Sequence, residues 1–290
     1  MGSLQLEKEI NMGYKAKKRL NSAIIHTVLI VGAVAMLLPF AWMILTAFKT
    51  KSQAISVDPF YIFPPGEWHW ENFTEVWNSY NFFTLYINTL VVMILRVICA
   101  VVTATMAGYA FGRLKFPGKK ILFSFVLIQM MVPSQIFIIP QYLMISKMHM
   151  LNTKFALVFP GIVTAFGTYL FKQGFQSLPV ELEEAAELDG CNVWQRFIHI
   201  MLPLTKSSIV SLSIFTALFA YKDMMWPMIV AGKPAATTLS AALAKLQGQF
   251  GSNYPQIMAG ALMAIVPMII IYLIFQKQFV EGIASSGTKL

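Results

Sequence analysis

Six long apolar segments constrain the fold of this chain more than any other feature. Crossing the hydrocarbon core of a bilayer takes about 20 residues of helix. Inside lipid the backbone polar groups must be satisfied within the chain, which favours helices, and no barrel-type alternation is present. The sequence therefore predicts an all-α membrane protein with six transmembrane helices, at 24–48, 85–114, 121–146, 155–171, 207–230 and 257–278.

The composition agrees with this fold class. Hydrophobic residues make up 57% of the 290-residue chain and charged residues only 12%, against about 25% charged in soluble domains. The net charge of +9 could suggest a nucleic-acid partner, but no soluble domain is present to carry a basic face. We therefore expect membrane lipid around the chain and no nucleic acid.

The first apolar segment resembles the start of a secretory signal, because a basic cluster at 15–19 precedes it. It continues to Phe48, however, whereas the apolar region of a signal peptide has about 7–15 residues. We expect an uncleaved first span. The two cysteines, Cys99 and Cys191, have no metal or redox spacing, and we expect no bond between them because one lies within a span.

The distribution of Lys and Arg predicts the orientation. With the N-terminus inside, the inner segments carry fourteen of these residues (5 + 4 + 3 + 2) and the outer segments six, with Arg96 and Lys222 inside spans. Both termini are then cytoplasmic. The predicted parts are a cytoplasmic segment 1–23, a first transmembrane helix 24–48, an extracytoplasmic loop 49–84, a core 85–280 containing a cytoplasmic loop 176–206, and a cytoplasmic tail 281–290.

The outer loops contain two features of interest. Trp68, Trp70 and Trp77 lie in the first outer loop, where such residues usually anchor a chain at the membrane interface; a carbohydrate platform is the alternative. In the last outer loop, 238–246 is periodic enough for a short interfacial helix.

Small residues repeat every four positions in the second span, at Ala104, Gly108 and Gly112. Such a stripe allows helix backbones to approach closely. We expect it to form a packing surface within the bundle, with dimerisation as the alternative.

The cytoplasmic loop contains Glu184-Ala185-Ala186, then Asp189-Gly190, then Ile200-x-Leu202-Pro203. Glu181, Glu183, Glu184 and Glu187 make its first part acidic, which suits pairing with arginines of another protein. The two alanines leave room for close docking, and Gly190 can end a helix in the left-handed conformation. The alternative, a helix lying on the inner leaflet, is disfavoured because anionic lipid repels acidic residues.

Further short motifs occur along the chain from about residue 25 onward. Together with the loop they resemble the sugar-type permease subunits of bacterial ABC importers, and in pattern the shorter membrane subunit of maltose-type transporters. The chain departs from the family at Tyr221-Lys222 and Ser207. The motifs are Leu38-Pro39-Phe40-Ala41-Trp42, Trp70-Glu71-Asn72-Phe73, Asn88-Thr89-Leu90, Tyr109-Ala110-Phe111-Gly112-Arg113-Leu114, Met131-Val132-Pro133, Ile139-Pro140 and Gln278-Phe279-Val280-Glu281-Gly282.

The resemblance implies a type I ABC importer permease fold and an assembly. Its other members would be a second homologous permease, two ATP-binding cassette ATPases and an extracytoplasmic solute-binding protein that delivers a carbohydrate, expected to be a di- or oligosaccharide. The resemblance also implies that the assembly lies in a bacterial inner or plasma membrane. ATP and Mg²⁺ would bind to the ATPases, with no cofactor on this chain, which has no P-loop motif. The 184–203 loop would couple transport to the ATPase, and the tail after Gln278 would reach the ATPase interface; a frayed terminus is the alternative.

Charged residues within the spans suggest a translocation path. Asp223 and Arg96 lie at similar predicted depths, and a charge in the membrane needs a partner. We predict that Asp223 faces the bundle interior and pairs with Arg96 or the neighbours of Lys222, beside a path that also includes Tyr221, Lys222 and Trp226. A purely structural ion pair is the alternative. Because Pro227 lacks an N–H, we also expect it to free the carbonyl of residue 223.

Two other functional classes were weighed. An ion-coupled secondary transporter would be expected to have repeats, broken helices and buried carboxylates, and Asp223 with Pro227 is the one such site. An intramembrane enzyme would need a nucleophile or metal constellation, but the four histidines, at 26, 69, 149 and 199, are scattered. We therefore predict a transport subunit that is not itself an enzyme.

Overall fold

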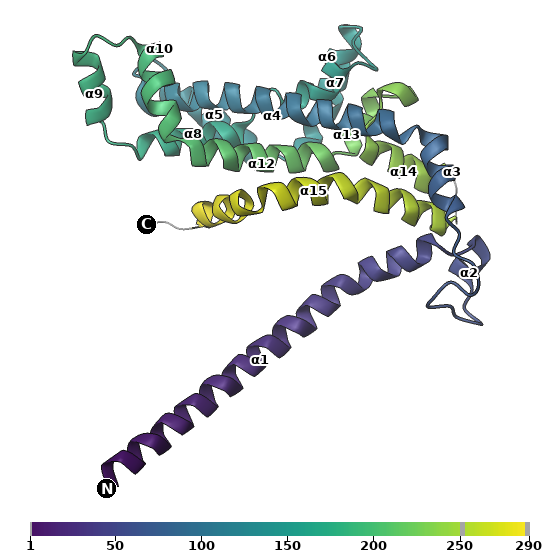
Figure 1. The fold of residues 1–290 in the computed structure, drawn as a ribbon. Coiled ribbons are helices and arrows are strands. Elements are labelled where there is room, and N and C mark those ends of the chain that lie inside the picture. Colours follow the sequence, from purple (N-terminus) through teal and green to yellow (C-terminus); the bar gives the residue numbers. More distant parts are fainter. Residues whose placement is uncertain (1, 250–252, 288–290) are drawn as a thin grey trace. The chain divides into compact units, whose positions relative to one another are not determined.

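The structure, a computed structural model, describes residues 2–249 and 253–287, and every regular element in these ranges is a helix. The chain forms two compact units, one of residues 1–75 with 252–262 and one of residues 76–251 with 263–290. Figure 1 shows the helices in order. The longer ones are α1 (Gly2–Ala47), α3 (Glu71–Tyr80), α4 (Phe82–Arg113), α5 (Lys119–Met131), α6 (Ile138–Lys147), α8 (Ala165–Gln176), α9 (Glu181–Leu188), α12 (Lys206–Lys222), α14 (Leu239–Gln249) and α15 (Tyr254–Gly287), and the short ones are α2 (Lys51–Ile55), α7 (Lys154–Val158), α10 (Val193–Gln195), α11 (Leu202–Leu204) and α13 (Met225–Val230).

The first unit contains α1 and the aromatic loop that follows it. The ring of Phe48 contacts those of Trp68, Trp70 and Phe73, at centroid distances of 4.9, 4.6 and 5.1 Å. Asn72 Nδ2 donates to the carbonyl of Ala47 at 2.9 Å. Aromatic packing and this amide therefore hold the loop against the end of α1.

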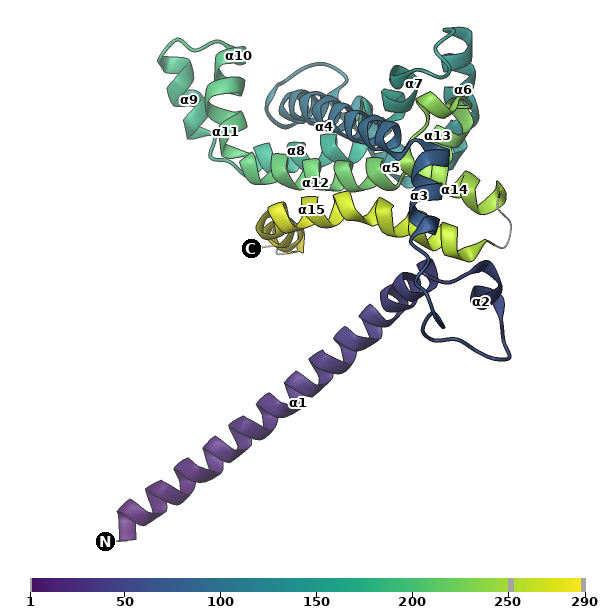
Figure 2. The ribbon, with the colours of Figure 1, turned by 45° about the vertical axis from the view of Figure 1, so that its right-hand side comes forward.

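The second unit is built on α4, with α8 and α12 packed along it. Figures 1 and 2 show α9 and α10 at one end of α4 and α13 and α14 near the other. One buried cluster, which includes Tyr109, Phe171, Phe175 and Phe197, fills the space beside α9 and α10. A second cluster, which includes Leu157 and Trp226, lies near α13.

Glycines allow α4 and α8 to pack closely. A Cβ on Gly108 would lie 2.4 Å from Phe171 Cβ and 2.9 Å from Lys172 N, and one on Gly112 would lie 3.3 Å from Lys172 O. Ala104 is fully buried on the same stripe. The predicted packing role of this stripe within the bundle is confirmed.

Asn88 and Thr89 of α4 bind residues 235–239, in the segment that precedes α14. Asn88 Nδ2 donates to the carbonyls of Ala235 and Thr237 at 2.8 and 3.1 Å, and Leu239 N donates to Thr89 Oγ1 at 2.9 Å. The helix predicted at 238–246 is present as α14. Its interfacial position remains a prediction.

The spans are less regular than the sequence suggested. Among the described residues, three helices are long and apolar enough to cross a membrane, Leu20–Ala47, Phe82–Arg113 and Tyr254–Gln278, and three bent helix pairs bring the number to six if each pair is one span. α15 is irregular at Phe275 but stays helical to Gly287. The predicted tail at 281–290 lies partly outside the described residues, because 288–290 are not described.

The prediction of one continuous helix over 121–146 is wrong. α5 ends at Met131, and the following helical segment is bent from it by 104°. Val132 has an extended backbone with ψ of 126°, as expected before a proline, whose ring disfavours the helical conformation of the preceding residue. The 155–171 segment is likewise bent, by 46°, between α7 and α8.

The predicted span 207–230 is also interrupted. α12 ends at Lys222, and Asp223 is extended, with ψ of 112°. We expected Pro227 to free the carbonyl of residue 223, four positions back in the same span, but Pro227 lies in the first turn of α13, where a missing N–H has no cost. The interruption therefore lies at Asp223, four residues earlier.

The approach of α4 to α8 can be tested with Gly108→Ala. Since the new Cβ would overlap Phe171 Cβ and the α8 backbone, we expect a loss of about 1–3 kcal/mol in stability, measured by thermal unfolding of the purified protein. The control is Gly32→Ala, also within a helix, where no atom lies within 4 Å of the added Cβ. Equal stability of the two variants would contradict the packing role.

Candidate functional site

The acidic loop folds as a short, well-terminated helix, α9. Gly190 has a φ of +83°. Gly190 N donates to Glu187 O at 3.0 Å and Cys191 N to Ala186 O at 2.9 Å, the hydrogen-bond pair of a Schellman motif. The predicted left-handed role of Gly190 at the helix end is confirmed.

A buried ion pair fixes α9 to the end of α4. Glu183 Oε2 lies 3.2 Å from Arg113 Nε, with the two side chains only 13% and 9% exposed. Tyr109 Oη donates to Glu183 Oε1 at 2.7 Å, and Arg113 also donates to the carbonyl of Leu178. Sequence analysis missed this role, although Tyr109 and Arg113 are four residues apart and so share one face of a helix.

The loop residues divide into an inward and an outward set. Ala186 is buried against the loop itself, and Glu187 pairs with Arg196. Ala186 and Glu183 therefore face inward, whereas the side chain of Glu187 remains 68% exposed beside Arg196. The docking role of the loop stays a prediction. The outward set, which we call the α9 outer face, consists of Glu181, Leu182, Glu184, Ala185, Glu187, Leu188 and Asp189.

The second half of the motif, which contains Ile200, Leu202 and Pro203, follows α9 in the chain and connects the loop with the rest of the bundle. Residues 196–201 form a π-helical segment that leads into α11. Ile200 and Leu202 are half-buried against the cluster around Phe197, whereas Pro203 is exposed in the first turn of α11. The structure thus joins Ile200 and Leu202 to the bundle core rather than to the α9 outer face.

A second group of functional residues surrounds Arg96, near the middle of α4. Its Nε and Nη2 donate to the carbonyl of Leu157 at 2.9 and 2.5 Å, and its Nη1 donates to Asp223 Oδ2 at 2.8 Å. Gly161 leaves room for the side chain, because a Cβ there would lie 2.9 Å from Arg96 Cγ and Cδ. The predicted pairing of Asp223 with Arg96 is confirmed.

Arg96, Lys222, Asp223 and Trp226 line one recess of about 470 Å³, which we call the polar recess. Trp226 is buried, and its Nε1 donates to Ala156 O at 2.7 Å. Tyr221 does not line the recess. It is buried, and its hydroxyl donates to the carbonyl of Ala264 on α15.

Two of the helix breaks border the polar recess. Ser134 and Gln135 follow the break after α5, and Asp223 and Met224 form the break after α12; all four line it. Non-helical backbone at membrane depth is tolerated only inside protein or beside water. Non-helical backbone from two interrupted segments therefore lines the recess.

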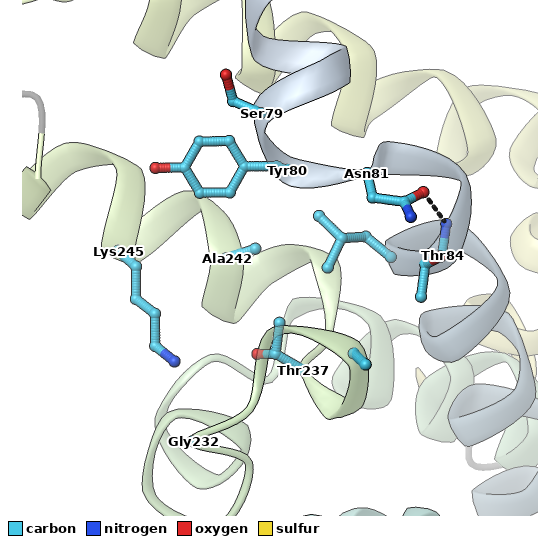
Figure 3. Close-up of a pocket in the computed structure, with 10 residues that line it drawn as sticks. Ser79, Tyr80, Asn81, Thr84, Gly232, Thr237, Ala242 and Lys245 are labelled. Atoms are coloured by element: carbon cyan, nitrogen blue, oxygen red, sulfur yellow. Dashed lines mark hydrogen bonds between the residues drawn. The ribbon is translucent and has the colours of Figure 1, made fainter.

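A larger recess, of about 810 Å³, lies between the α3–α4 turn and α14. Figure 3 shows Lys245 and Ala242 of α14 across from Tyr80 and Asn81 of that turn, with Thr237 below. Thr237 is buried, and its Oγ1 has no hydrogen-bond partner among the residues that the structure describes. The described residues contain no group of three or more His, Cys, Asp or Glu side chains that could hold a metal ion.

These features define an apolar helical bundle with broken helices, a polar recess and a short acidic helix exposed at one end, which is the architecture of a membrane transport subunit. Residues 100–281 match the family described as the binding-protein-dependent transport system inner membrane component, and the chain belongs to it.

Relatives along nearly the whole chain are sugar transport permeases. The chain is 31% identical over 277 residues to the arabinooligosaccharides transport system permease protein AraQ of Halalkalibacterium halodurans, covering 94% of this chain and 99% of that protein. It is 26% identical to the diacetylchitobiose uptake system permease protein NgcG of Streptomyces coelicolor, covering 92% and 88%. The relatives are transport permeases and not enzymes.

The fold also matches a solved structure. A chain of a bacterial ABC transporter involved in the import of the acidic polysaccharide alginate superimposes with a TM-score of 0.74 at 20% identity, over 89% of this chain and 96% of that one. The protein therefore has an ABC importer permease fold and is a membrane protein.

The α4–α9 connection can be tested with Arg113→Gln. Removing one partner of a buried pair leaves the other uncompensated, which costs about 3–5 kcal/mol, so we expect faster amide hydrogen exchange across 177–192. The control is Arg196→Gln, whose partner Glu187 is 68% exposed, because exposed pairs contribute about 0–1 kcal/mol. Unchanged exchange in Arg113→Gln would contradict the anchoring role of Glu183.

The polar recess can be tested with Asp223→Asn. The change leaves the charge of Arg96 uncompensated within the bundle, so we expect uptake by the assembled transporter to fall at least tenfold, while subunit co-purification persists. Asp58→Asn, at an exposed aspartate of the first outer loop, is the control and should have no effect. If uptake and assembled complex decrease in parallel, the ion pair has a structural role alone.

Proposed function

We propose that this chain is one of two permease subunits of an ATP-driven, binding-protein-dependent importer of a di- or oligosaccharide. It crosses the membrane six times with both termini in the cytoplasm, and it forms half of a path that opens alternately to each side. Its relatives support the substrate class, since one serves arabinooligosaccharides and another diacetylchitobiose.

The observation that carries the coupling proposal is the arrangement of α9. The buried pair of Glu183 with Arg113 ties this helix to α4, so a force on α9 is transmitted to a helix that borders the polar recess. Its outer face presents Glu184 and the apolar side chain of Leu188, which is 89% exposed. An exposed apolar side chain amid carboxylates suits a partner with a hydrophobic groove edged by arginines.

That partner, in our proposal, is an ATP-binding cassette ATPase, of which two copies bind ATP and Mg²⁺ beneath the two permeases. This chain holds no nucleotide itself. An extracytoplasmic binding protein delivers the saccharide to the opposite end, and the tail after Gln278 extends toward the ATPases. Deletion of 284–290 that leaves ATPase stimulation unchanged would remove the tail from this proposal.

Coupling can be tested with Glu184→Lys and Gly190→Val. The first reverses a charge on the α9 outer face. The second forces a β-branched residue into a positive φ, which costs more than about 1 kcal/mol, although no atom lies within 4 Å of the new Cβ. We expect both variants to insert in the membrane but to lose the co-purifying ATPase and ATP-driven uptake.

Two matched controls separate coupling from general damage. Gly190→Asn should keep most activity, because asparagine tolerates the left-handed conformation at a helix end. Glu67→Lys reverses an exposed charge in the first outer loop and should have no effect on ATPase binding. Normal uptake by both Glu184→Lys and Gly190→Val, or uptake that needs an ion gradient and no ATPase, would overturn the proposal.

A further inference from the structure

Lys222 gives the polar recess a positive charge that has no carboxylate partner in the described part of the chain. The neighbouring carboxylate of Asp223 is already paired with Arg96, at 2.8 Å. The ammonium of Lys222 lies 5.0 Å from the centroid of the Phe219 ring, and its side chain is exposed. Two cations and one carboxylate line the recess, so its net charge is 2 − 1 = +1.

This charge lies near the middle of α4. Arg96 is 14 residues after Phe82 and 17 before Arg113, or about 21 and 26 Å at 1.5 Å per residue. Because Asp223 contacts Arg96, Lys222 is at a similar height. If α4 crosses the membrane as proposed, an ammonium at this height cannot face lipid without a large cost. It must face water or an anion.

Uncharged groups around Lys222 suit the rest of a saccharide. Ser134, Gln135 and Gln141 line the recess, and their side chains make no hydrogen bond to other described residues, which leaves them free for hydroxyl groups. Phe219 and Met225 supply apolar surface for the C–H face of a sugar ring. A few polar groups on an apolar wall, in a recess of about 470 Å³, are typical of a small-molecule site.

We propose that the polar recess binds an anionic saccharide and that Lys222 is the residue that selects its carboxylate or phosphate group. The proposal rests on the function proposed above and adds the charge of the substrate. An acidic side chain of the neighbouring permease is a different partner for Lys222, but it would leave the free amides of Gln135 and Gln141 unexplained.

The proposal can be tested by measuring saccharide binding to the purified complex of permeases and ATPases. The binding protein is left out of this complex, so its own ligand preference does not affect the result. Calorimetry would compare digalacturonate with its neutral counterpart galactobiose, and lactose phosphate with lactose; inorganic phosphate controls for anions alone. We expect the anionic member of at least one pair to bind at least tenfold more tightly, and its identity separates carboxylate from phosphate. Lys222→Gln should abolish this preference, whereas Lys222→Arg and the matched control Lys245→Gln, in the larger recess of Figure 3, should keep it.

Three results would overturn the inference. The first is that neither anionic probe binds more tightly than its neutral counterpart, and the second is that the preference for the anionic probe remains in Lys222→Gln. The third is that the complex with Lys222→Gln loses the partner permease while the complex with Lys222→Arg keeps it, which would assign Lys222 to a contact between subunits. A complex that retains its ATPases and imports neutral saccharides would then leave the proposed function intact. Failure to assemble with an ATPase would instead overturn the proposed function.

Discussion

The guanidinium of Arg96 is the group on which the arrangement of the second unit depends. A charge near the middle of a long apolar helix must be satisfied locally, and Arg96 does this with the Leu157 carbonyl and the Asp223 carboxylate. The first partner belongs to α7, which ends in the bend before α8, and the second lies at the break between α12 and α13. One side chain on a straight helix therefore holds two interrupted helices in place and closes one side of the polar recess.

The same helix also carries the residues that anchor α9. Arg113 and Tyr109, at the other end of α4, hold Glu183 of α9, while Gly108 lets α8 lie directly against α4 between the two sites. α4 is thus one continuous helix that connects α9, the proposed docking site of another protein, with the polar recess, the proposed binding site of the solute. The proposed function needs such a connection, because in that proposal ATP is hydrolysed on a different chain.

Much of the organisation could be predicted because it depends on local chemistry. Apolar segments located the helices, the glycine stripe located the closest packing, and Gly190 marked the end of α9 through its positive φ. The ion pair of Arg96 and Asp223 also followed from sequence, since two opposite charges at one membrane depth have few other partners. The sequence analysis missed the helix breaks at Val132 and Asp223. An apolar composition indicates that a segment is shielded from water, but it does not indicate whether the helix in that segment is continuous.

Sequence by itself determined a helical membrane protein of the importer permease type, because hydrophobic length, small-residue spacing and the loop motif are properties of the chain alone. Only the tertiary structure decided which members of that motif face outward. Glu183 and Glu184 are adjacent and chemically identical, yet one is buried against Arg113 and the other is exposed, because successive helix positions point about 100° apart. The same holds for Tyr221, which points to α15, and Lys222, which lines the recess: what differs between them is the direction of the side chain, and that is fixed by packing.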